Sequence, residues 1–288
     1  MSNDWTVQDL LDWTREHFHT RSISEPRLEA EVLLAFALNT TRVGLYVQYD
    51  RPVNAEERSW FKELVKRRQA GEPVAYITGS REFMSMPFKV DRRVLIPRPD
   101  TETLVEAAIK HLKGLKRPCK AVDVGTGSGA IAVSLARYVP DAEIIAVDID
   151  PSALELAGEN ASVNGLADRV VFLTGSLLSP VEADELDLVA ANLPYIPTAE
   201  MTKLAKEIRE FEPVLALDGG PDGLDYYRGL LPQAYARLRP GGLLLMEISD
   251  QAQAEALIAD CGPGWQAQCI LCDLGGRARV VGMNRGEQ

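Results

Sequence analysis

The sequence predicts an α/β fold: a doubly wound, mostly parallel sheet of seven strands, preceded by a small N-terminal helical domain and a β-hairpin linker. Beyond residue 120, short runs rich in Val, Ile and Leu alternate with helical segments, a pattern that builds a parallel sheet with helices on both faces. The first 70 residues carry only helical patterns. We therefore expect a helical domain over 1–72, a hairpin and connector over 73–99, and an α/β domain over 100–288.

Length and charge narrow the class of protein. At 288 residues, with 46% hydrophobic and 25% charged residues, the chain suits two unequal globular domains. Its net charge of -11 argues against a general affinity for nucleic acid, because phosphate-binding domains usually carry a basic face. The amino terminus does not read as a signal peptide, and no apolar run reaches the roughly 18 residues of a membrane span. We expect a cytoplasmic protein without direct nucleic-acid or membrane partners.

Helix-start signals mark the first domain. Thr6 with Asp9 and Asn54 with Glu57 form possible capping boxes, and Pro26 marks a start between them. This part holds no cluster of catalytic residue types. We therefore expect it to recognise a partner.

Prolines punctuate the connector, and two short runs in it read as β-strands, Met86–Val90 and Arg93–Ile96. They predict a hairpin followed by a stiff linker, with a helix starting near Asp100.

The third part should hold the sheet. Its last two strands are joined by only Asp273 to Gly276, too short for a parallel crossover, so the sheet should end in an antiparallel hairpin. The expected strands are 121–124, 143–148, 170–174, 187–191, 243–248, 266–272 and 279–283, with helices over 130–138 and 151–164.

Cys269 and Cys272 form a C-x-x-C pair in one expected strand. A zinc site needs two further ligands, and the three histidines all lie far upstream. We expect buried, reduced thiols and no metal site.

A glycine-rich turn follows the first strand, in the pattern Asp-x-Gly-x-Gly-x-Gly from Asp123 to Gly129. Glycines let the backbone approach a ligand closely at the start of a helix. Asp148 ends the second strand, about 20 residues later, where a carboxylate can bind both hydroxyls of a ribose. This spacing favours S-adenosylmethionine over NAD or FAD, and the loop at Ser176 and Leu177 should lie under the adenine.

The fourth strand ends in Asn192-Leu193-Pro194-Tyr195, at the edge where a doubly wound sheet binds its ligand. An amide nitrogen is a poor nucleophile, but two fixed acceptors can align its lone pair with an activated methyl group. The Asn192 side-chain oxygen and the Leu193 carbonyl are candidates, Pro194 stiffens the turn, and Tyr195 offers a face for stacking. The rate would come from alignment and electrostatics. The motif thus predicts methylation of a planar, weakly nucleophilic nitrogen, such as a glutamine amide.

The predicted site residues fall into two groups. The catalytic residues are Asn192, Leu193, Pro194 and Tyr195. The cofactor-binding residues are Asp123, Gly125, Thr126, Gly127, Ser128, Gly129, Asp148, Ser176, Leu177 and Asn192.

Further motifs are spread over most of the chain: Pro73–Gly79, Arg81–Phe83, Ile96–Glu102, Asp123–Gly129, Glu212-Pro213 with Ala216–Gly220, Arg239–Gly242 and Asp273–Gly276. With these motifs the chain resembles the protein-(glutamine-N5) methyltransferases that modify class 1 peptide chain release factors. The resemblance implies a class I methyltransferase sheet, S-adenosyl-L-methionine as cofactor, and the glutamine of a Gly-Gly-Gln tripeptide as target, held by Asn192 to Tyr195.

Two positions depart from the family pattern. Leu193 stands where the family has proline, and Ser176 stands where an acidic residue is usual. Because the acceptor at position 193 is a backbone carbonyl, we expect Leu193→Pro to keep or improve turnover. The segment from Glu212 to Leu224 has no role that its residue types reveal.

Three other functions are compatible with parts of the pattern. An N6-adenine-type methyltransferase acting on nucleic acid would use a similar motif, with Tyr195 stacking on the base. A nicotinamide-dependent dehydrogenase would leave the motif after the fourth strand unexplained. A catalytically silent binding module would transfer no methyl group at all.

Overall fold

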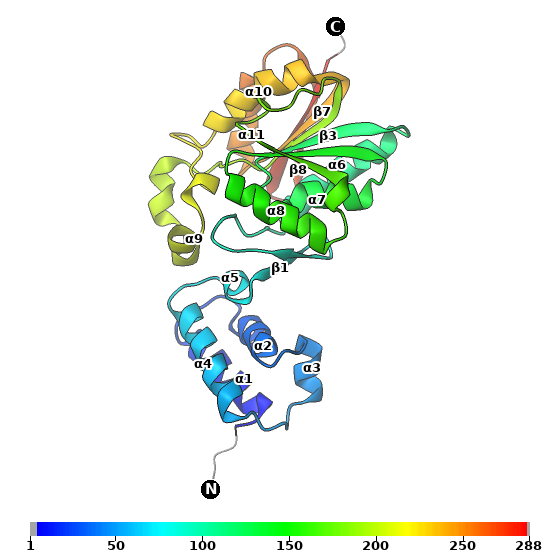
Figure 1. The fold of residues 1–288 in the computed structure, drawn as a ribbon. Helices are drawn as coiled ribbons and strands as arrows, with labels where there is room; N and C mark the ends of the chain where they lie inside the picture. Colours follow the sequence, from blue (N-terminus) through cyan, green and yellow to red (C-terminus); the bar gives the residue numbers. More distant parts are fainter. Residues whose placement is uncertain (1–4, 287–288) are drawn as a thin grey trace. The chain divides into compact units, whose positions relative to one another are not determined.

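The computed structural model describes residues 5–286, which form two compact units (Figure 1). The first unit runs to Gly79 and also takes in Ala205–Phe211. The second consists of Ser80–Leu204 and the chain from Glu212 onward.

The first unit is helical, as expected. Both predicted capping boxes are present, at Thr6 with Asp9 and at Asn54 with Glu57. Pro26 is the first residue of its helix. The helices are α1 (Val7–His19), α2 (Pro26–Ala37), α3 (Arg42–Val47), α4 (Ala55–Gln69), α5 (Val74–Thr78) and α9 (Lys206–Phe211).

Helix α9 joins the first unit through Arg68, although it lies far along the chain. The Arg68 side chain is 5% exposed and forms ion pairs with Glu29 at 2.6 Å and Glu207 at 2.7 Å. A buried guanidinium needs such partners to offset its lost hydration. One arginine therefore links three helices of this unit.

The second unit opens with a hairpin whose strands are β1 (Ser80–Phe83) and β2 (Met86–Lys89). The first β-like run of the connector is therefore a strand, but the prediction for Arg93–Ile96 was wrong. Those residues carry no strand pairing. Val94 instead packs with Ala153 and Leu156 of helix α8 (Pro151–Val163), so its apolar character reflects burial against a helix.

The main sheet has seven strands in the order β5-β4-β3-β6-β7-β9-β8. Pairing is parallel from β5 to β7 and antiparallel between β7, β9 and β8, which confirms the predicted terminal hairpin. The strands are β3 (Cys119–Val124), β4 (Ala142–Asp148), β5 (Val170–Thr174), β6 (Leu186–Ala191), β7 (Leu238–Glu247), β8 (Trp265–Cys272) and β9 (Ala278–Arg285).

Alternate strand residues face two separate cores. In β7, Leu243 and Leu245 belong to one core and Leu244 and Met246 to the other, as the two-residue period of a strand requires. Helices therefore cover both faces (Figure 1). Helices α6 (Thr101–Gly114) and α7 (Ala130–Tyr138) pack on the first core, and α10 (Asp225–Arg237) and α11 (Gln251–Asp260) pack on the second.

Strand β3 lies between β4 and β6, so the chain order reverses at this point of the sheet. Ligands of doubly wound proteins bind beyond the carboxyl ends of the strands at such a reversal. The turns after β3, β4 and β6 carry the three predicted motifs.

The cysteine prediction was partly wrong. All four thiols are free, but only Cys119 is buried; Cys261 is half-buried, and Cys269 and Cys272 are exposed. Strand β8 is the edge strand of the sheet, and a C-x-x-C spacing cannot tell an edge strand from a central one. In residues 5–286, no helix combines the length and apolarity that crossing a membrane would require.

Candidate active site

A cavity lies beyond the carboxyl ends of β3, β4, β5 and β6, within the second unit. It brings together most of the residues predicted from sequence, from the glycine turn, the end of β4, the loop after β5 and the motif after β6. Its predicted lining residues are Gly125, Thr126, Gly127, Ser128, Asp148, Ser176, Leu177, Asn192, Leu193 and Pro194.

Backbone torsions explain the three glycines of the turn. Gly125, Gly127 and Gly129 have φ of +73°, +53° and +80°, which side chains with a Cβ rarely adopt. A Cβ on Gly129 would also lie 3.0 Å from the Cβ of Ala157, so this glycine lets α7 and α8 pack closely. Gly129 itself does not line the cavity.

Asp123 is fully buried and supports the turn from below. Its Oδ2 accepts hydrogen bonds from the Thr126 hydroxyl at 2.6 Å and the Ala132 amide at 3.1 Å. Burial raises the pKa of Asp123 to about 7, although these two bonds oppose the shift. Asp123 is not among the residues that line the cavity, so the geometry makes it a support for the turn.

Asp148 faces the cavity and is fixed by two backbone donors. Its Oδ2 accepts from the Gly127 amide at 2.8 Å and its Oδ1 from the Asp150 amide at 3.0 Å. Burial raises the pKa of Asp148, while these amides lower it in part. A carboxylate held in this way has lone pairs left for a diol.

The loop after β5 contributes Ser176, which is exposed, and Leu177. Leu177 has φ of +52°, an unfavourable conformation for a residue with a Cβ. Strain of this kind persists only where neighbouring structure imposes it. Leu177, the strained residue, lines the cavity.

The Asn192 side chain lines the cavity in a defined orientation. Its Nδ2 donates a hydrogen bond to Thr101 Oγ1 at 3.2 Å. Since the amide nitrogen is engaged, the side-chain oxygen is the group left to accept a hydrogen bond from a ligand. This is the polarity that an NH2-bearing substrate requires.

Leu193 is buried between the glycine turn and Tyr227. Its amide donates to the Tyr227 hydroxyl at 3.2 Å, and that hydroxyl in turn donates to the carbonyl of Glu247. The Leu193 side chain fills the space above Gly125, where an added Cβ would lie 2.7 Å from Leu193 Cδ2. Position 193, where the family motif has proline, is therefore tightly packed.

Tyr195 is the one predicted catalytic residue that does not line the cavity. Its hydroxyl donates to Glu247 Oε1 at 3.2 Å, and its carbonyl accepts from Gln253 Nε2 at 2.8 Å. Burial is the main reason that the pKa of Tyr195 lies well above its ordinary value. Both polar ends of Tyr195 are thus held by the protein.

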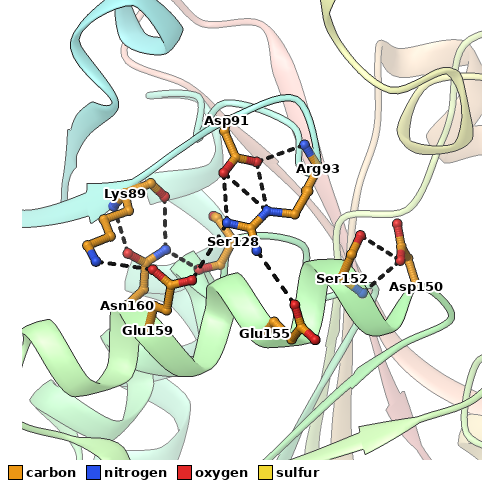
Figure 2. A network of polar contacts seen from close by, with 9 residues as sticks. All are labelled: Lys89, Asp91, Arg93, Ser128, Asp150, Ser152, Glu155, Glu159 and Asn160. Carbon is orange, nitrogen blue, oxygen red and sulfur yellow. Dashed lines mark hydrogen bonds and ion pairs between the residues drawn. The ribbon is translucent and has the colours of Figure 1, made fainter.

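Asn160 ties the connector to the glycine turn (Figure 2). Its side-chain oxygen accepts from the Lys89 amide at 2.6 Å, and its nitrogen donates to the carbonyls of Lys89 at 3.0 Å and Ser128 at 2.9 Å. The side chain is fully buried, so all three bonds are shielded from water. Arg93 adds ion pairs to Asp91 and Glu159 beside it.

The segment that begins at Glu212 now has a structural role. Buried Glu212 accepts hydrogen bonds from the Ile96 amide at 3.2 Å and from the Arg98 guanidinium. Further along, Gly219 and Gly223 lie so close to the chemistry motif that an added Cβ would meet the Pro194 carbonyl oxygen at 2.5 Å and that of Tyr195 at 2.2 Å. The segment therefore packs against the backbone of Pro194 and Tyr195 and forms one side of the cavity.

Sequence reasoning missed part of the cavity wall. The carboxyl-edge argument that found Asn192 also applies to Glu247 at the end of β7, which was overlooked; Glu247 does not line the cavity but bonds Tyr195. The connector motif was noticed but not assigned to the wall. The missed lining residues are Arg93, Val94, Leu95, Pro97, Arg98, Thr101, Val124, Ala130, Ile131, Ile149, Asp150, Ala153, Gly175, Pro213, Leu215, Ala216 and Tyr226.

Comparison with known proteins agrees with this architecture. Residues 9–79 match the model of the PrmC N-terminal domain, and residues 101–219 match that of ribosomal protein L11 methyltransferase (PrmA). A methyltransferase from Pyrococcus furiosus superposes with a TM-score of 0.52 at 17% identity, covering 77% of this chain and 98% of its own. At that identity the likeness concerns the fold.

Two curated relatives match over nearly the whole chain. The release factor glutamine methyltransferase of Moorella thermoacetica is 48% identical over 98% of this chain and 100% of its own. That of Geobacter sulfurreducens is 43% identical over 96% of each chain.

Proposed function

This chain belongs to the release factor glutamine methyltransferase family, and from that premise we propose its reaction in detail. It transfers a methyl group from S-adenosyl-L-methionine to the side-chain amide nitrogen of the glutamine in the Gly-Gly-Gln motif of class 1 peptide chain release factors. One observation carries the proposal. The Asn192 side-chain oxygen, left free by the bond from Nδ2 to Thr101, lines the same cavity as the glycine turn and Asp148.

The cavity residues fit the cofactor. The glycine turn leaves its face of the cavity without side chains at Gly125 and Gly127, Asp148 offers carboxylate lone pairs for ribose hydroxyls, and Leu177 offers an apolar surface for adenine. When bound, S-adenosylmethionine supplies a methyl group made electrophilic by a positive sulfonium sulfur. Serine at position 176 can accept a hydrogen bond from the adenine amino group, more weakly than an acidic residue.

The protein's own contribution is to orient the glutamine. The Asn192 oxygen and the Leu193 carbonyl accept its two N–H hydrogens, which turns the nitrogen lone pair toward the methyl carbon. The bound cofactor would give up its methyl group to the amide nitrogen and leave as the neutral thioether, and the alkylated nitrogen would then lose one proton to water. Such alignment contributes several kcal/mol to catalysis without a general base.

The first unit and the site have separate tasks in this proposal. Helices of the first unit recognise the release factor, and the cavity of the second unit performs the chemistry. Because release factors act during translation termination, we place the enzyme in the cytoplasm. Methylation of adenine in nucleic acid would need the same kind of acceptors, but the family membership favours glutamine.

The test is a transfer assay with purified class 1 release factor and cofactor carrying a labelled methyl group. We expect label on the factor with its native Gly-Gly-Gln and none on a Gln→Ala version. Label retained on the Ala version would place the target elsewhere. Asn192→Ala should abolish transfer while weakening cofactor binding only in part, and normal turnover by that variant would contradict the role of Asn192.

A further inference from the structure

The Tyr227 hydroxyl contacts both polar backbone groups of one residue of the chemistry motif, Leu193. Tyr227 lies in α10 and is fully buried. Its hydroxyl oxygen is 3.2 Å from the Leu193 amide nitrogen and 3.2 Å from the Leu193 carbonyl oxygen. A shorter hydrogen bond joins the same hydroxyl to the carbonyl of Glu247, the last residue of β7.

These contacts lie where two neighbouring strands end. The last paired residues of β6 and β7 are Ala191 and Met246, and Leu193 and Glu247 follow directly after them. The motif therefore begins where the pairing of β6 with β7 stops. Through its hydroxyl, Tyr227 joins the backbone of the motif to β7 beyond that point.

The directions of the hydrogen bonds leave the Leu193 carbonyl available to a substrate. A hydroxyl has one hydrogen to donate and two lone pairs. The Leu193 amide can only donate, so the Tyr227 oxygen accepts from it. The hydroxyl hydrogen then goes to the Glu247 carbonyl, the nearer of the two carbonyl oxygens. The Leu193 carbonyl keeps its lone pairs for the substrate N–H that the proposed reaction brings to it.

The contact with Tyr227 matters more here than in a chain with proline at position 193. A proline has a fixed φ and no N–H, so its own ring restrains the backbone. Leu193 lacks that restraint and has an N–H in a buried position, where an N–H needs an acceptor. Tyr227 supplies both the acceptor and the restraint.

We propose that Tyr227 is a positioning residue for methyl transfer: it fixes the Leu193 carbonyl, as the proline ring does in the family motif. This inference rests on the proposed function, because it assigns a cause to the placement of one of the two acceptors in that reaction. Tyr227 does not line the cavity, and it touches neither substrate nor cofactor in this scheme. Loss of its hydroxyl should therefore lower turnover and leave binding largely intact.

The experiment uses the full chain with Tyr227→Phe, Leu193→Pro and the double variant, assayed for methyl transfer to release factor. We expect Tyr227→Phe to lower kcat about tenfold, because a small displacement of an aligning group is costly to the reaction rate. Leu193→Pro should stay within about twofold of wild type. The double variant should stay within about threefold of Leu193→Pro, since the proline ring removes the need for the hydroxyl.

Rescue by proline separates positioning from mere structural support. A purely structural role of the hydroxyl would leave the same loss of turnover in both backgrounds. The Kd for cofactor, measured by calorimetry, and the KM for release factor should stay within about threefold in every variant, and the calorimetry also shows that each variant is folded. Full turnover in Tyr227→Phe, or a tenfold loss in the double variant, would overturn the proposal.

Tyr138→Phe is the matched control. The Tyr138 hydroxyl also donates to a backbone carbonyl, that of Met84 at 2.8 Å, and Tyr138 does not line the cavity. This variant loses a comparable hydrogen bond away from the motif, so its kcat should equal that of wild type. A tenfold lower kcat in Tyr138→Phe would show that loss of any such hydroxyl impairs the enzyme, and would overturn the specific role of Tyr227.

The wild-type arm tells this inference apart from the proposed function. If the wild-type chain places no label on a native Gly-Gly-Gln factor, the proposed function fails. If the wild type is active and Tyr227→Phe matches it, only the role of Tyr227 fails.

Discussion

Two buried glutamates, one in each unit, have similar surroundings, but their pKa values are shifted in opposite directions. Glu31 is 3% exposed and Glu247 is 1% exposed, and each accepts a hydrogen bond from a tyrosine hydroxyl, Tyr46 or Tyr195. Burial raises the pKa of Glu31, but hydrogen bonds from Tyr46, Arg42 and Arg27 outweigh it and leave the pKa below its usual value. Burial raises the pKa of Glu247 to about 7, because the Thr101 and Tyr195 hydroxyls oppose it only in part.

The difference between the two pKa shifts follows from the number of partners that each carboxylate has. In the helical unit the carboxylate has two arginine partners, at 2.9 Å and 2.6 Å, and stabilises the packing of α2 with α3. Beside the chemistry motif, the Glu247 carboxylate accepts the Tyr195 hydroxyl at Oε1, and its Oε2 has no hydrogen-bond partner among residues 5–286. Buried groups with perturbed pKa values gather at functional sites, and Glu247 is hydrogen-bonded to Tyr195 of the chemistry motif.

The largest effect on stability should come from a side chain whose polar atoms are all satisfied. Asn160→Asp replaces a donor with a carboxylate that faces the carbonyls of Lys89 and Ser128. We expect a loss of about 3 kcal/mol in the free energy of unfolding, measured by urea denaturation, and about tenfold weaker cofactor binding. Asn164→Asp is the matched control, since Asn164 lies one turn later and bonds the Pro87 carbonyl without reaching the glycine turn.

Asn164→Asp should lose less than about 1 kcal/mol, because its site is only partly buried. Equal losses in the free energy of unfolding of Asn160→Asp and Asn164→Asp would show that the hydrogen bond to the Ser128 carbonyl adds no stability of its own.

The contrast between Glu31 and Glu247 can be tested directly by changing each of them to glutamine. Glu31→Gln should lower the free energy of unfolding by about 2 kcal/mol, since it leaves Arg27 and Arg42 without their charged partner, and should leave kcat unaltered. Glu247→Gln should keep or raise stability at pH 8, because it removes a buried charge that forms no ion pair within residues 5–286. Denaturation and turnover of both variants check this; a loss of stability in Glu247→Gln that matches Glu31→Gln would end the distinction.

The pH dependence of the free energy of unfolding tests the effect of a buried carboxyl at a second position. Asp123, like Glu247, has a pKa of about 7. Its folded pKa lies above the unfolded value, so its stabilising contribution is complete below about pH 4 and is lost as pH rises through 7. Asp123→Asn should flatten the fall in unfolding free energy over that range by about 1 kcal/mol per pH unit.

Glu247 contributes a slope of the same sign, with Asp100 raising its pKa and Arg279 lowering it, so some slope should remain in Asp123→Asn. Glu31→Gln should remove a slope of the opposite sign, because stability from a lowered pKa is lost as pH falls. Denaturation series from about pH 3 to 8 would measure all three, because the Glu31 slope lies below the ordinary glutamate pKa of about 4.3. Identical profiles for wild type and Asp123→Asn would contradict the buried-acid interpretation.

The fold and the cofactor side of the cavity were predictable because they follow local rules. Alternating β and α patterns predict a mostly parallel sheet with helices on both faces, and the turn from Gly125 to Gly129 needs torsions that glycine supplies. Glu247, Thr101 and Glu212 could not be placed in this way. Each acts through a partner far along the chain, and one sequence does not show which distant residues pack together.

Tyr195 shows a different limit. Its aromatic ring predicts stacking on a substrate, but the residue type does not reveal the hydroxyl bond to Glu247 that holds the side chain. The segment after Glu212 was likewise unreadable, because the need for Gly219 and Gly223 arises only where the chain passes the Pro194 and Tyr195 carbonyls.

The smallest expected effect concerns Leu193, the departure from the family motif. Leu193→Pro keeps the carbonyl acceptor but removes the N–H that donates to the Tyr227 hydroxyl, one neutral hydrogen bond worth about 1 kcal/mol. We expect stability to fall by about that amount while kcat stays within about twofold of wild type. Tyr227→Phe removes the same bond from the other side but also the link to the Glu247 carbonyl, so it should lose more. If Leu193→Pro lost turnover tenfold with cofactor binding unaltered, the amide of residue 193 would belong to the catalytic geometry, and the proline of related motifs would have to be compensated elsewhere.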